Sequence, residues 1–309
     1  MPTVIPDRRG ISLAELIVVV AMLGLIGSMI GSTMVRQQRF YRGATELLAV
    51  REDVRDAMEL LSTDIRGLSS ADTVRLMADS AIELFASIGS SVVCQNIGAS
   101  EVGLPPARSS GNTLSAFLAQ PDTGDLAVFY GDSIEGSARW ERHRIVGLAS
   151  RSLATSCPAS DGFSDQSDLD AGRNGYLLSL ANPLSAAVKP GTPVRFIRRG
   201  RHSLYRGADG EWYLGYRRCN ALGASVCGAI QPLSGPYRAY SSNQRATGFL
   251  LEYFDSAGGR LDPASPPFVL ARVDITARSE SSQRILVEGR AKAYSDSATI
   301  SVALRNRTP

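Results

Sequence analysis

The feature that most constrains this chain is an uncharged apolar run close to its N-terminus. Leu16 to Val35 are 20 consecutive residues without a formal charge. As an α-helix that rises about 1.5 Å per residue, the run is about 30 Å long, which matches the hydrocarbon core of a membrane. It is longer than the apolar region of about 7–15 residues in a secretory signal peptide, and no clear small-residue cleavage site follows it. We therefore expect a retained, single transmembrane helix.

The charges before the run indicate its orientation. Arg8 and Arg9 lie in the short segment that precedes it. Positively charged flanks stay preferentially in the cytoplasm. We therefore expect a cytoplasmic N-terminus, with the rest of the chain on the far side of the membrane.

The composition leaves little room for several common enzyme classes. Lys189 and Lys292 are the only lysines, and neither precedes Ser or Thr, so the phosphate-binding Gly-Lys-Ser/Thr sequence is absent. His143 and His202 are the only histidines, which leaves little for a His-ligated metal or a His-based triad. A net charge of +3 is too balanced for a nucleic-acid surface. We expect no enzyme, no cofactor, no metal and no specific nucleic-acid partner.

One carboxylate, Glu15, stands at the start of the apolar segment. The chain reads Arg-Arg-Gly-Ile-Ser-Leu-Ala-Glu-Leu over residues 8–16. A charge inside a bilayer costs about 2.5 kcal/mol or more and usually has a partner. In a plain anchor, Glu15 would instead lie at the headgroup boundary, solvated or protonated.

This order of residues resembles the N-terminal processing signal of type IV pilins and pseudopilins. The resemblance implies that a prepilin peptidase cleaves after Gly10 and methylates the new amine of Ile11. It also implies that Glu15 pairs with the N-terminal amine of a neighbouring subunit, since a buried carboxylate and a buried ammonium each need a partner. The chain departs from the usual pattern by having Ile11 in place of Phe, Ser12 in place of Thr, and Ala14 in place of a larger aliphatic residue.

The resemblance implies a structural subunit, most like a large minor pilin or a minor pseudopilin of type II secretion. Its expected partners are the prepilin peptidase, other pilin or pseudopilin subunits, the inner-membrane assembly platform and, before assembly, membrane lipid. Its head would lie in the periplasm and then in a periplasmic or extracellular filament. The expected parts are a leader (1–10), a transmembrane half-helix (11–35), an amphipathic half-helix (36–69) and a β-rich head (70–309).

Small residues gather within the apolar run. Gly24, Gly27 and Gly31 include one Gly-x-x-x-Gly spacing, and such residues let helix backbones approach closely in lipid. Membrane helices are also generally richer in Gly than soluble ones. We interpret these three glycines as helix-packing positions.

The helix should continue well beyond the membrane, because no proline occurs between Pro6 and Pro105. Apolar residues recur at steps of three, four and seven, which is one face of a helix. They are Phe40, Ala44, Leu47, Val54, Met58, Leu61, Ile65 and Leu68. A helix from Ile11 to Leu68 would be about 87 Å long, with its second half packed on the head.

After residue 70, short β-branched or aromatic runs alternate with turn residues. This predicts strands at Ile82–Ala86, Leu114–Leu118, Leu126–Tyr130, Trp140–Leu148, Tyr176–Leu180, Val194–Arg198, Ser203–Arg206, Glu211–Tyr216, Phe249–Phe254, Val269–Ala277 and Ala298–Leu304. The clearest hairpin is Ser203–Tyr216, which turns at Ala208-Asp209-Gly210. The predicted fold class is α+β, with a long N-terminal helix on a mostly antiparallel, pilin-like sheet.

The four cysteines are expected to form disulfides, because the head would lie in an oxidising compartment. Cys219 and Cys227 enclose seven residues, which favours a local bridge and leaves Cys94 with Cys157. Four cysteines allow three connectivities. Zinc is disfavoured because no close Cys-x-x-Cys pair is present.

Three other features are interpreted as structural. Asp161, Asp165, Asp168 and Asp170 could gather oxygens around calcium, but they lack EF-hand spacing and are typical of a solvated loop. Gly131-Asp132-Ser133 is interpreted as a turn and not as a hydrolase serine. His143 falls in the predicted strand Trp140–Leu148, so we interpret it as structural or exposed and not as catalytic.

Three function hypotheses follow. The first is a filament subunit, favoured by the processing signal, with a head too bulky for a densely repeated major subunit. The second is a membrane-anchored binding module or adhesin. The third, an anchored periplasmic enzyme, has little support. The identity of the mature N-terminus separates the first from the other two.

Overall fold

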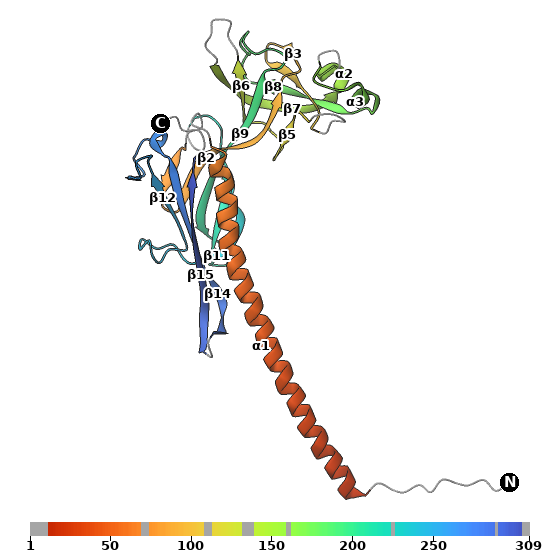
Figure 1. The fold of residues 1–309 in the computed structure, drawn as a ribbon, viewed down its shortest axis with the longest axis vertical. Helices are drawn as coiled ribbons and strands as arrows, with labels where there is room; N and C mark the ends of the chain where they lie inside the picture. The colour runs from red at the N-terminus through yellow and green to blue at the C-terminus, as the bar shows by residue number, and fades with distance from the viewer. Residues whose placement is uncertain are drawn as a thin grey trace, which may run out of the picture. The chain divides into compact units, whose positions relative to one another are not determined.

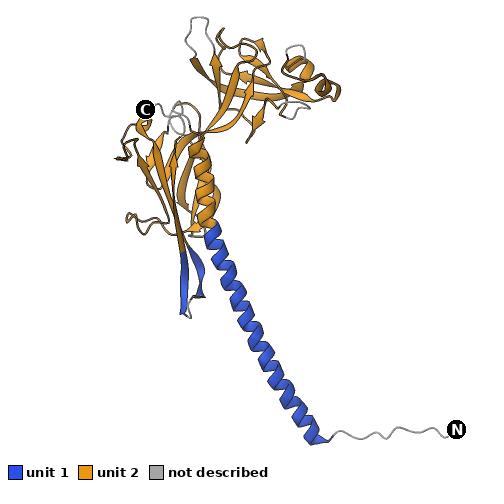
Figure 2. Ribbon diagram, in the orientation of Figure 1, with its two compact units in different colours: residues 1–52, 280–295 blue, residues 53–279, 296–309 orange. Residues whose placement is uncertain are grey.

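The structure is a computed structural model, and Figure 1 shows its elements. It describes residues 12–68, 74–107, 113–131, 139–158, 162–223, 226–287 and 290–304. The predicted cleavage site at Gly10 and Ile11 therefore lies outside the described residues, as do Asp132, Ser133 and Asp161. The chain divides into two compact units, coloured separately in Figure 2. Unit 1 comprises residues 1–52 and 280–295, and unit 2 comprises residues 53–279 and 296–309.

A single long helix opens the described chain. Helix α1 runs from Leu13 to Arg66 over 54 residues, which confirms a long N-terminal helix and lies within two residues of both expected ends. No proline interrupts it, and Gly67 follows its last residue, with the Gly67 amide donating to the Thr63 carbonyl at 3.1 Å. The helix is long and apolar enough to cross a membrane.

In unit 2, the apolar face of α1 forms part of a hydrophobic core. Leu61 and Ile65 have no exposed surface, and Val54, Met58 and Leu68 are also buried. The core that they join includes Ile82 and Leu84 from the first sheet described below, and Phe249 and Ile275 from the second. On the opposite face, the charged residues Arg55, Asp56 and Glu59 are exposed.

The predicted apolar face is wrong at its N-terminal end. Phe40 is 72% exposed, and its ring meets only the neighbouring Tyr41 ring, edge to face at 6.0 Å, among the described residues. Ala44 and Leu47 are half-buried, and Val50 is the first fully buried residue of the helix. The periodicity continues through Phe40, but the core does not extend that far along the helix.

A pair of substitutions tests this boundary. We expect Leu61→Ala to lower the free energy of unfolding by about 2–5 kcal/mol, because it leaves a cavity in a fully buried site. Phe40→Ala should change it by less than about 0.5 kcal/mol, because the ring is exposed. Urea unfolding of the detergent-solubilised chain measures both. Equal losses would show that the core reaches Phe40.

The strands form two sheets, in which all the described pairs are antiparallel. The larger contains β1 (Leu76–Ala78), β2 (Ala81–Val92), β3 (Gln95–Gly98), β4 (Glu101–Leu104), β5 (Ala116–Phe117), β6 (Leu126–Gly131), β7 (Arg139–Ser152), β8 (Asn174–Leu180), β9 (Pro193–Arg206), β10 (Trp212–Arg218) and β11 (Gln231–Tyr237). Its main order is β1-β2-β9-β6-β7-β8-β4-β3. The second has the order β13-β12-β14-β15, with β12 (Phe249–Phe254), β13 (Arg260–Leu261), β14 (Arg272–Val287) and β15 (Arg290–Ala303). Short helices α2 (Leu153–Ser156), α3 (Gln166–Asp170) and η2 (Pro267–Val269) complete the described elements.

Every predicted strand overlaps an observed one, but several bounds differ. The predicted hairpin is confirmed: Tyr205 faces Tyr213 across β9 and β10. Val194–Arg198 and Ser203–Arg206 prove to be one strand, β9, because the polar residues between them also pair with β2. Strands β1, β3, β4, β11 and β13 were not predicted, being short or rich in Gly and polar residues.

Both expected disulfides are present. Cys94 bonds to Cys157 across 63 residues of sequence, and Cys219 to Cys227 across 8. Cys94 and Cys157 lie fully buried with Leu153, so the longer bridge ties β7 and α2 to the segment between β2 and β3.

Removing the longer bridge should cost more stability. We expect Cys94→Ala with Cys157→Ala to lower the free energy of unfolding by about 2–4 kcal/mol, since the bridge restricts a long loop of the unfolded chain. The matched variant, Cys219→Ala with Cys227→Ala, removes a bridge that closes a much shorter loop. It should lower the free energy of unfolding by less. Urea unfolding followed by tryptophan fluorescence compares them. A larger loss from the short bridge would contradict this ranking.

Candidate functional site

The candidate site is the start of helix α1, where the sequence placed Glu15. The Ser12 amide donates to Glu15 Oε2 at 3.0 Å, and the Glu15 amide donates to Ser12 Oγ at 3.2 Å. These reciprocal bonds form a capping box, which satisfies two amides at the helix N-terminus that have no partner within the helix. Glu15 also stands where the helix dipole favours a negative charge.

The capping box assigns a role to Ser12 that the sequence analysis missed. The Ser-x-x-Glu spacing of Ser12 and Glu15 predicts a capping box and could have identified this role. Both side chains are exposed. In the described part of the chain, only one Glu15 oxygen is engaged. Oε1 is therefore open to a donor from outside the described residues.

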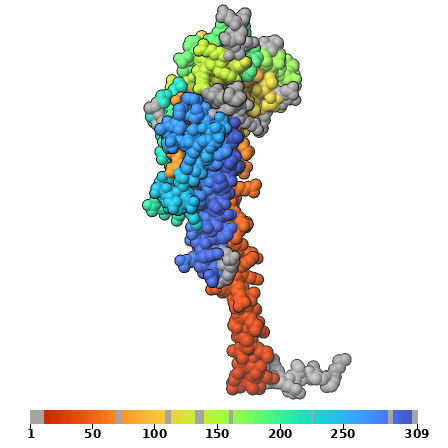
Figure 3. Space-filling model, turned by 60° about the vertical axis from the view of Figure 1, so that its left-hand side comes forward, coloured from red at the N-terminus to blue at the C-terminus, as the bar shows by residue number. Residues whose placement is uncertain are grey.

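An apolar surface follows the cap without interruption. Large apolar side chains from Leu13 to Val35 are between 46% and 78% exposed, and Figure 3 shows this part of α1 uncovered on the face drawn. Isolated surface hydrophobics are ordinary, but a contiguous apolar surface of this extent indicates lipid or protein contact.

The glycines of this segment leave the helix surface open. A Cβ atom added at Gly24, Gly27 or Gly31 would meet nothing within 4 Å, so the described residues fill none of these positions. The hydroxyls of Ser28 and Ser32 donate to backbone carbonyls three residues earlier, at 2.8 and 2.9 Å. The polar groups are thus satisfied within the helix, as a lipid environment requires.

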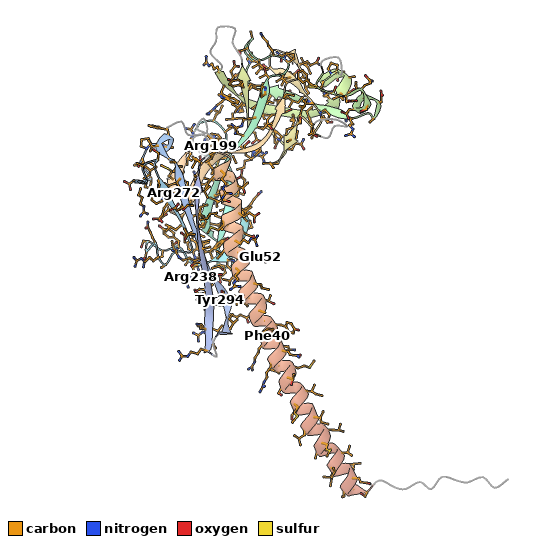
Figure 4. The ribbon with its side chains drawn as sticks, in the orientation of Figure 1. Phe40, Glu52, Arg199, Arg238, Arg272 and Tyr294 are labelled. Atoms are coloured by element: carbon orange, nitrogen blue, oxygen red, sulfur yellow. A yellow bond between two sulfur atoms is a disulfide. The ribbon has the colours of Figure 1, made fainter. Side chains whose placement is uncertain are left out.

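Among the described residues, a buried charge cluster lies in unit 2 around Glu83. Glu83 is 1% exposed, and its two oxygens accept from Arg199 at 2.6 Å and from Arg201 at 2.7 Å. Arg199, labelled in Figure 4, also donates to the Asn220 and Gly223 carbonyls at 3.1 and 3.2 Å. The arginines bind both carboxylate oxygens, so the cluster joins β2 and β9 to the loop of the short disulfide.

Glu83 also lies close to two sulfur atoms. One oxygen of Glu83 and the sulfurs of Cys219 and Cys227 lie within 4.8 Å of one another. A metal needs thiolates and a free carboxylate. Here the sulfurs are bonded to each other and the carboxylate is held by two guanidinium groups, so these residues do not fit a metal.

A serine, a glutamate and a histidine meet between β7 and the segment after β8. Ser185 Oγ donates to Glu141 Oε1, and His143 Nε2 lies 3.3 Å from Glu141 Oε2. Burial raises the pKa of Glu141, but the bonds from Ser185 and His143 outweigh it and hold the pKa below its usual value. A nucleophilic serine needs the imidazole beside its hydroxyl. Here the carboxylate separates the two groups, and His143 is buried against Phe129, which agrees with a structural role.

The described aspartates of the acidic segment each have a separate local role. Asp165 caps α3 by accepting from the Ser167 amide at 2.8 Å, and the hydrogen bonds from Ser167 lower its pKa. Asp168 is fully buried with Arg173 at 3.2 Å, and Asp170 accepts from the Gln166 amide group at 3.0 Å. These contacts do not converge on one cation.

The sequence was also compared with known proteins. A scan against models of protein families found no match, and a search of the curated proteins found none either. A functional interpretation therefore rests on the chemistry of the N-terminal helix and of the head.

Proposed function

We propose that this chain is a structural subunit of a type IV-like filament, a minor pilin or a minor pseudopilin, cleaved after Gly10 by a prepilin peptidase. The observation that carries the proposal is the coincidence, at one helix start, of the Gly10–Ile11 junction, the capped and exposed Glu15, and the uncovered apolar surface beyond it. Membrane anchoring alone requires the apolar surface but not the junction or the carboxylate.

In this proposal, Glu15 receives an ammonium group. Cleavage after Gly10 would leave the amine of Ile11 at the end of the chain, and the same enzyme would methylate it. One Glu15 oxygen is held by the Ser12 amide while the other has no partner in the described chain. Pairing that oxygen with the amine of a neighbouring subunit would neutralise two charges that are each costly in an apolar environment.

The exposed helix supplies the assembly surface. Before assembly, lipid would cover Leu16–Val35 in the inner membrane. In the filament, helices of neighbouring subunits would cover it, with Gly24, Gly27 and Gly31 permitting close approach. The assembly platform would extract the subunit from the membrane. The two disulfides support a head on the periplasmic side, because disulfides persist in oxidising compartments.

A second candidate is an anchored binding module or adhesin. Tyr130 and Trp140 face each other across β6 and β7 with ring centroids 4.9 Å apart, and they are 38% and 42% exposed. An exposed aromatic pair is a common recognition surface. This function is compatible with filament assembly, so the two proposals need separate tests.

Cell fractionation tests the filament proposal. The tagged chain should appear in filaments sheared from cells, or in periplasmic filaments when pilin-like subunits are overproduced. Its accumulation there should require the prepilin peptidase. Retention in the membrane fraction, with or without the peptidase, would support an anchored module instead.

A further inference from the structure

A cluster of arginines directly follows the apolar run. Arg36, Arg39 and Arg42 are exposed, and the ten residues 36–45 contain no acid. Within the described chain, none of the three has an ion pair or a side-chain hydrogen bond. Exposed arginines without a protein partner are available to phosphate groups, which the planar guanidinium can bind through two parallel hydrogen bonds.

Two exposed aromatic rings lie among these arginines. Phe40 and Tyr41 are 72% and 68% exposed. Phe40 was expected on the buried face of the helix and is exposed instead. Tyrosine and tryptophan concentrate at membrane–water interfaces, because they combine an apolar ring with a polar group. Tyr41 has both, and Phe40 adds apolar surface beside it.

The β14–β15 hairpin is fixed to this part of α1 within unit 1. Ser282 donates from its amide to Glu46 at 3.1 Å, and its hydroxyl lies at the same distance from the other Glu46 oxygen. Ile285 is buried, and it lies close enough that a Cβ atom at Gly43 would be 3.8 Å from it. Tyr294, labelled with Phe40 in Figure 4, donates from its amide to Ser281 Oγ at 2.9 Å and joins the two strands.

These contacts set the depth of the hairpin relative to a membrane. As β14 advances from Ser282 to Ile285, its contacts move from Glu46 back to Gly43, so the strand runs toward the helix N-terminus. Gly43 is eight residues beyond Val35, or about 12 Å along the axis. Two more strand residues approach the membrane by about 7 Å. Val287, the last residue of β14, thus lies about 5 Å from the apolar run along the axis, within a headgroup layer of about 5–8 Å.

The hairpin brings two further arginines near this layer. Arg284 adjoins Ile285, which lies level with Gly43 about 12 Å beyond Val35, and a long arginine side chain can extend from there toward the headgroups. Arg284 and Arg290 are exposed on either side of the hairpin end, and within the described residues neither has a charged partner. With Arg36, Arg39 and Arg42 they make five exposed arginines on this segment of α1 and on the hairpin that contacts it. We refer to these five arginines, with Phe40 and Tyr41, as the interfacial collar.

We propose that the interfacial collar binds the phosphate headgroups of anionic phospholipids on the side of the membrane that faces the head. The aromatic rings enter the headgroup boundary, while the hairpin presents arginines that are distant in sequence from the span. The collar thereby fixes the depth and rotation of the helix before assembly. This inference rests on α1 spanning a membrane and does not depend on filament formation.

Native mass spectrometry of the detergent-solubilised full chain tests the proposal, with phosphatidylglycerol and phosphatidylcholine added together. We expect preferential retention of phosphatidylglycerol. Each cation near an anionic surface favours binding about fivefold, so Arg284→Gln with Arg290→Gln should reduce the preference more than about tenfold. Arg55→Gln with Arg245→Gln is a control with the same loss of charge at exposed positions outside the collar.

Hydrogen exchange then localises the contact. In nanodiscs that contain phosphatidylglycerol, backbone amides of residues 283–287 and 290–292 should exchange more slowly than in pure phosphatidylcholine, and high salt should remove the difference. The Arg284/Arg290 variant should lose it and the control should keep it. Equal exchange in both lipids, or a preference that survives in the Arg284/Arg290 variant, would overturn the proposal. So would loss of filament incorporation in that variant with unchanged lipid preference, because the collar would then bind a neighbouring subunit.

Discussion

Glu15→Leu is expected to leave membrane insertion and cleavage intact and to reduce filament incorporation sharply. The span has 20 uncharged residues without Glu15, and loss of a carboxylate eases insertion. The variant removes the partner proposed for a neighbouring ammonium. Breaking a buried ion pair by removing one member costs about 3–5 kcal/mol, because the remaining charge is uncompensated. Immunoblots of sheared-filament and membrane fractions measure the ratio of assembled to membrane-retained chain.

Two controls separate assembly from local helix stability. Ser12→Ala removes the hydroxyl that accepts from the Glu15 amide but keeps the Glu15 carboxylate, so it should retain near-normal incorporation. Glu52→Leu removes an exposed glutamate from the same helix, outside the apolar segment, and should also assemble. If Glu15→Leu is incorporated as well as wild type, the carboxylate has no role in assembly.

Gly10→Val is expected to abolish processing. A branched side chain at Gly10 would crowd the bond that the peptidase must approach. The precursor would then stay in the membrane with its leader of 10 residues attached. Intact-mass measurement of the purified chain, expressed with the peptidase, distinguishes the two lengths.

Gly24→Val is the matched control for this substitution. It adds the same side chain to the N-terminal region, at a position where a Cβ meets nothing within 4 Å. Normal trimming is expected, because the cleavage site is unchanged. Normal trimming of Gly10→Val would refute the assigned cleavage site.

The long helix and the strand positions were predictable because they depend on local pattern. Residues 54–68 carry an uninterrupted 3.6-residue apolar period, and the structure buries that face. The hairpin at Ala208-Asp209-Gly210 has a turn between two aromatic runs, and β9 and β10 pair across it. In both regions, the residues that specify local structure also form the core.

The errors arose where tertiary contacts override the local pattern. Phe40 continues the apolar period, but no core faces it. The charged residues Arg199 and Arg201 led to the prediction of two separate strands. Glu83 on the neighbouring strand pairs with both arginines, so β9 continues through them. The ends of β14 and β15 were missed because residues 278–296 are largely polar, although Ile285 packs against α1 there.

The candidate site was only partly visible in the sequence. The carboxylate of Glu15 was recognised from its place in an apolar run, whereas its hydrogen bonds with Ser12 depend on the helix beginning at Leu13. Arg8 and Arg9 before the span indicate a cytoplasmic N-terminus, but three arginines also follow the span. The charges on the two sides therefore give only a weak indication of orientation. The disulfides therefore provide the stronger support for a head outside the cytoplasm.

The mass of the mature N-terminus tests the filament proposal most directly. The chain should be purified from membranes of cells that express the prepilin peptidase, and its N-terminal peptide sequenced by tandem mass spectrometry. The proposal predicts a chain that begins at an N-methylated Ile11, with 299 of the 309 residues. A chain that retains Met1, or one that is cut beyond residue 30, would contradict it.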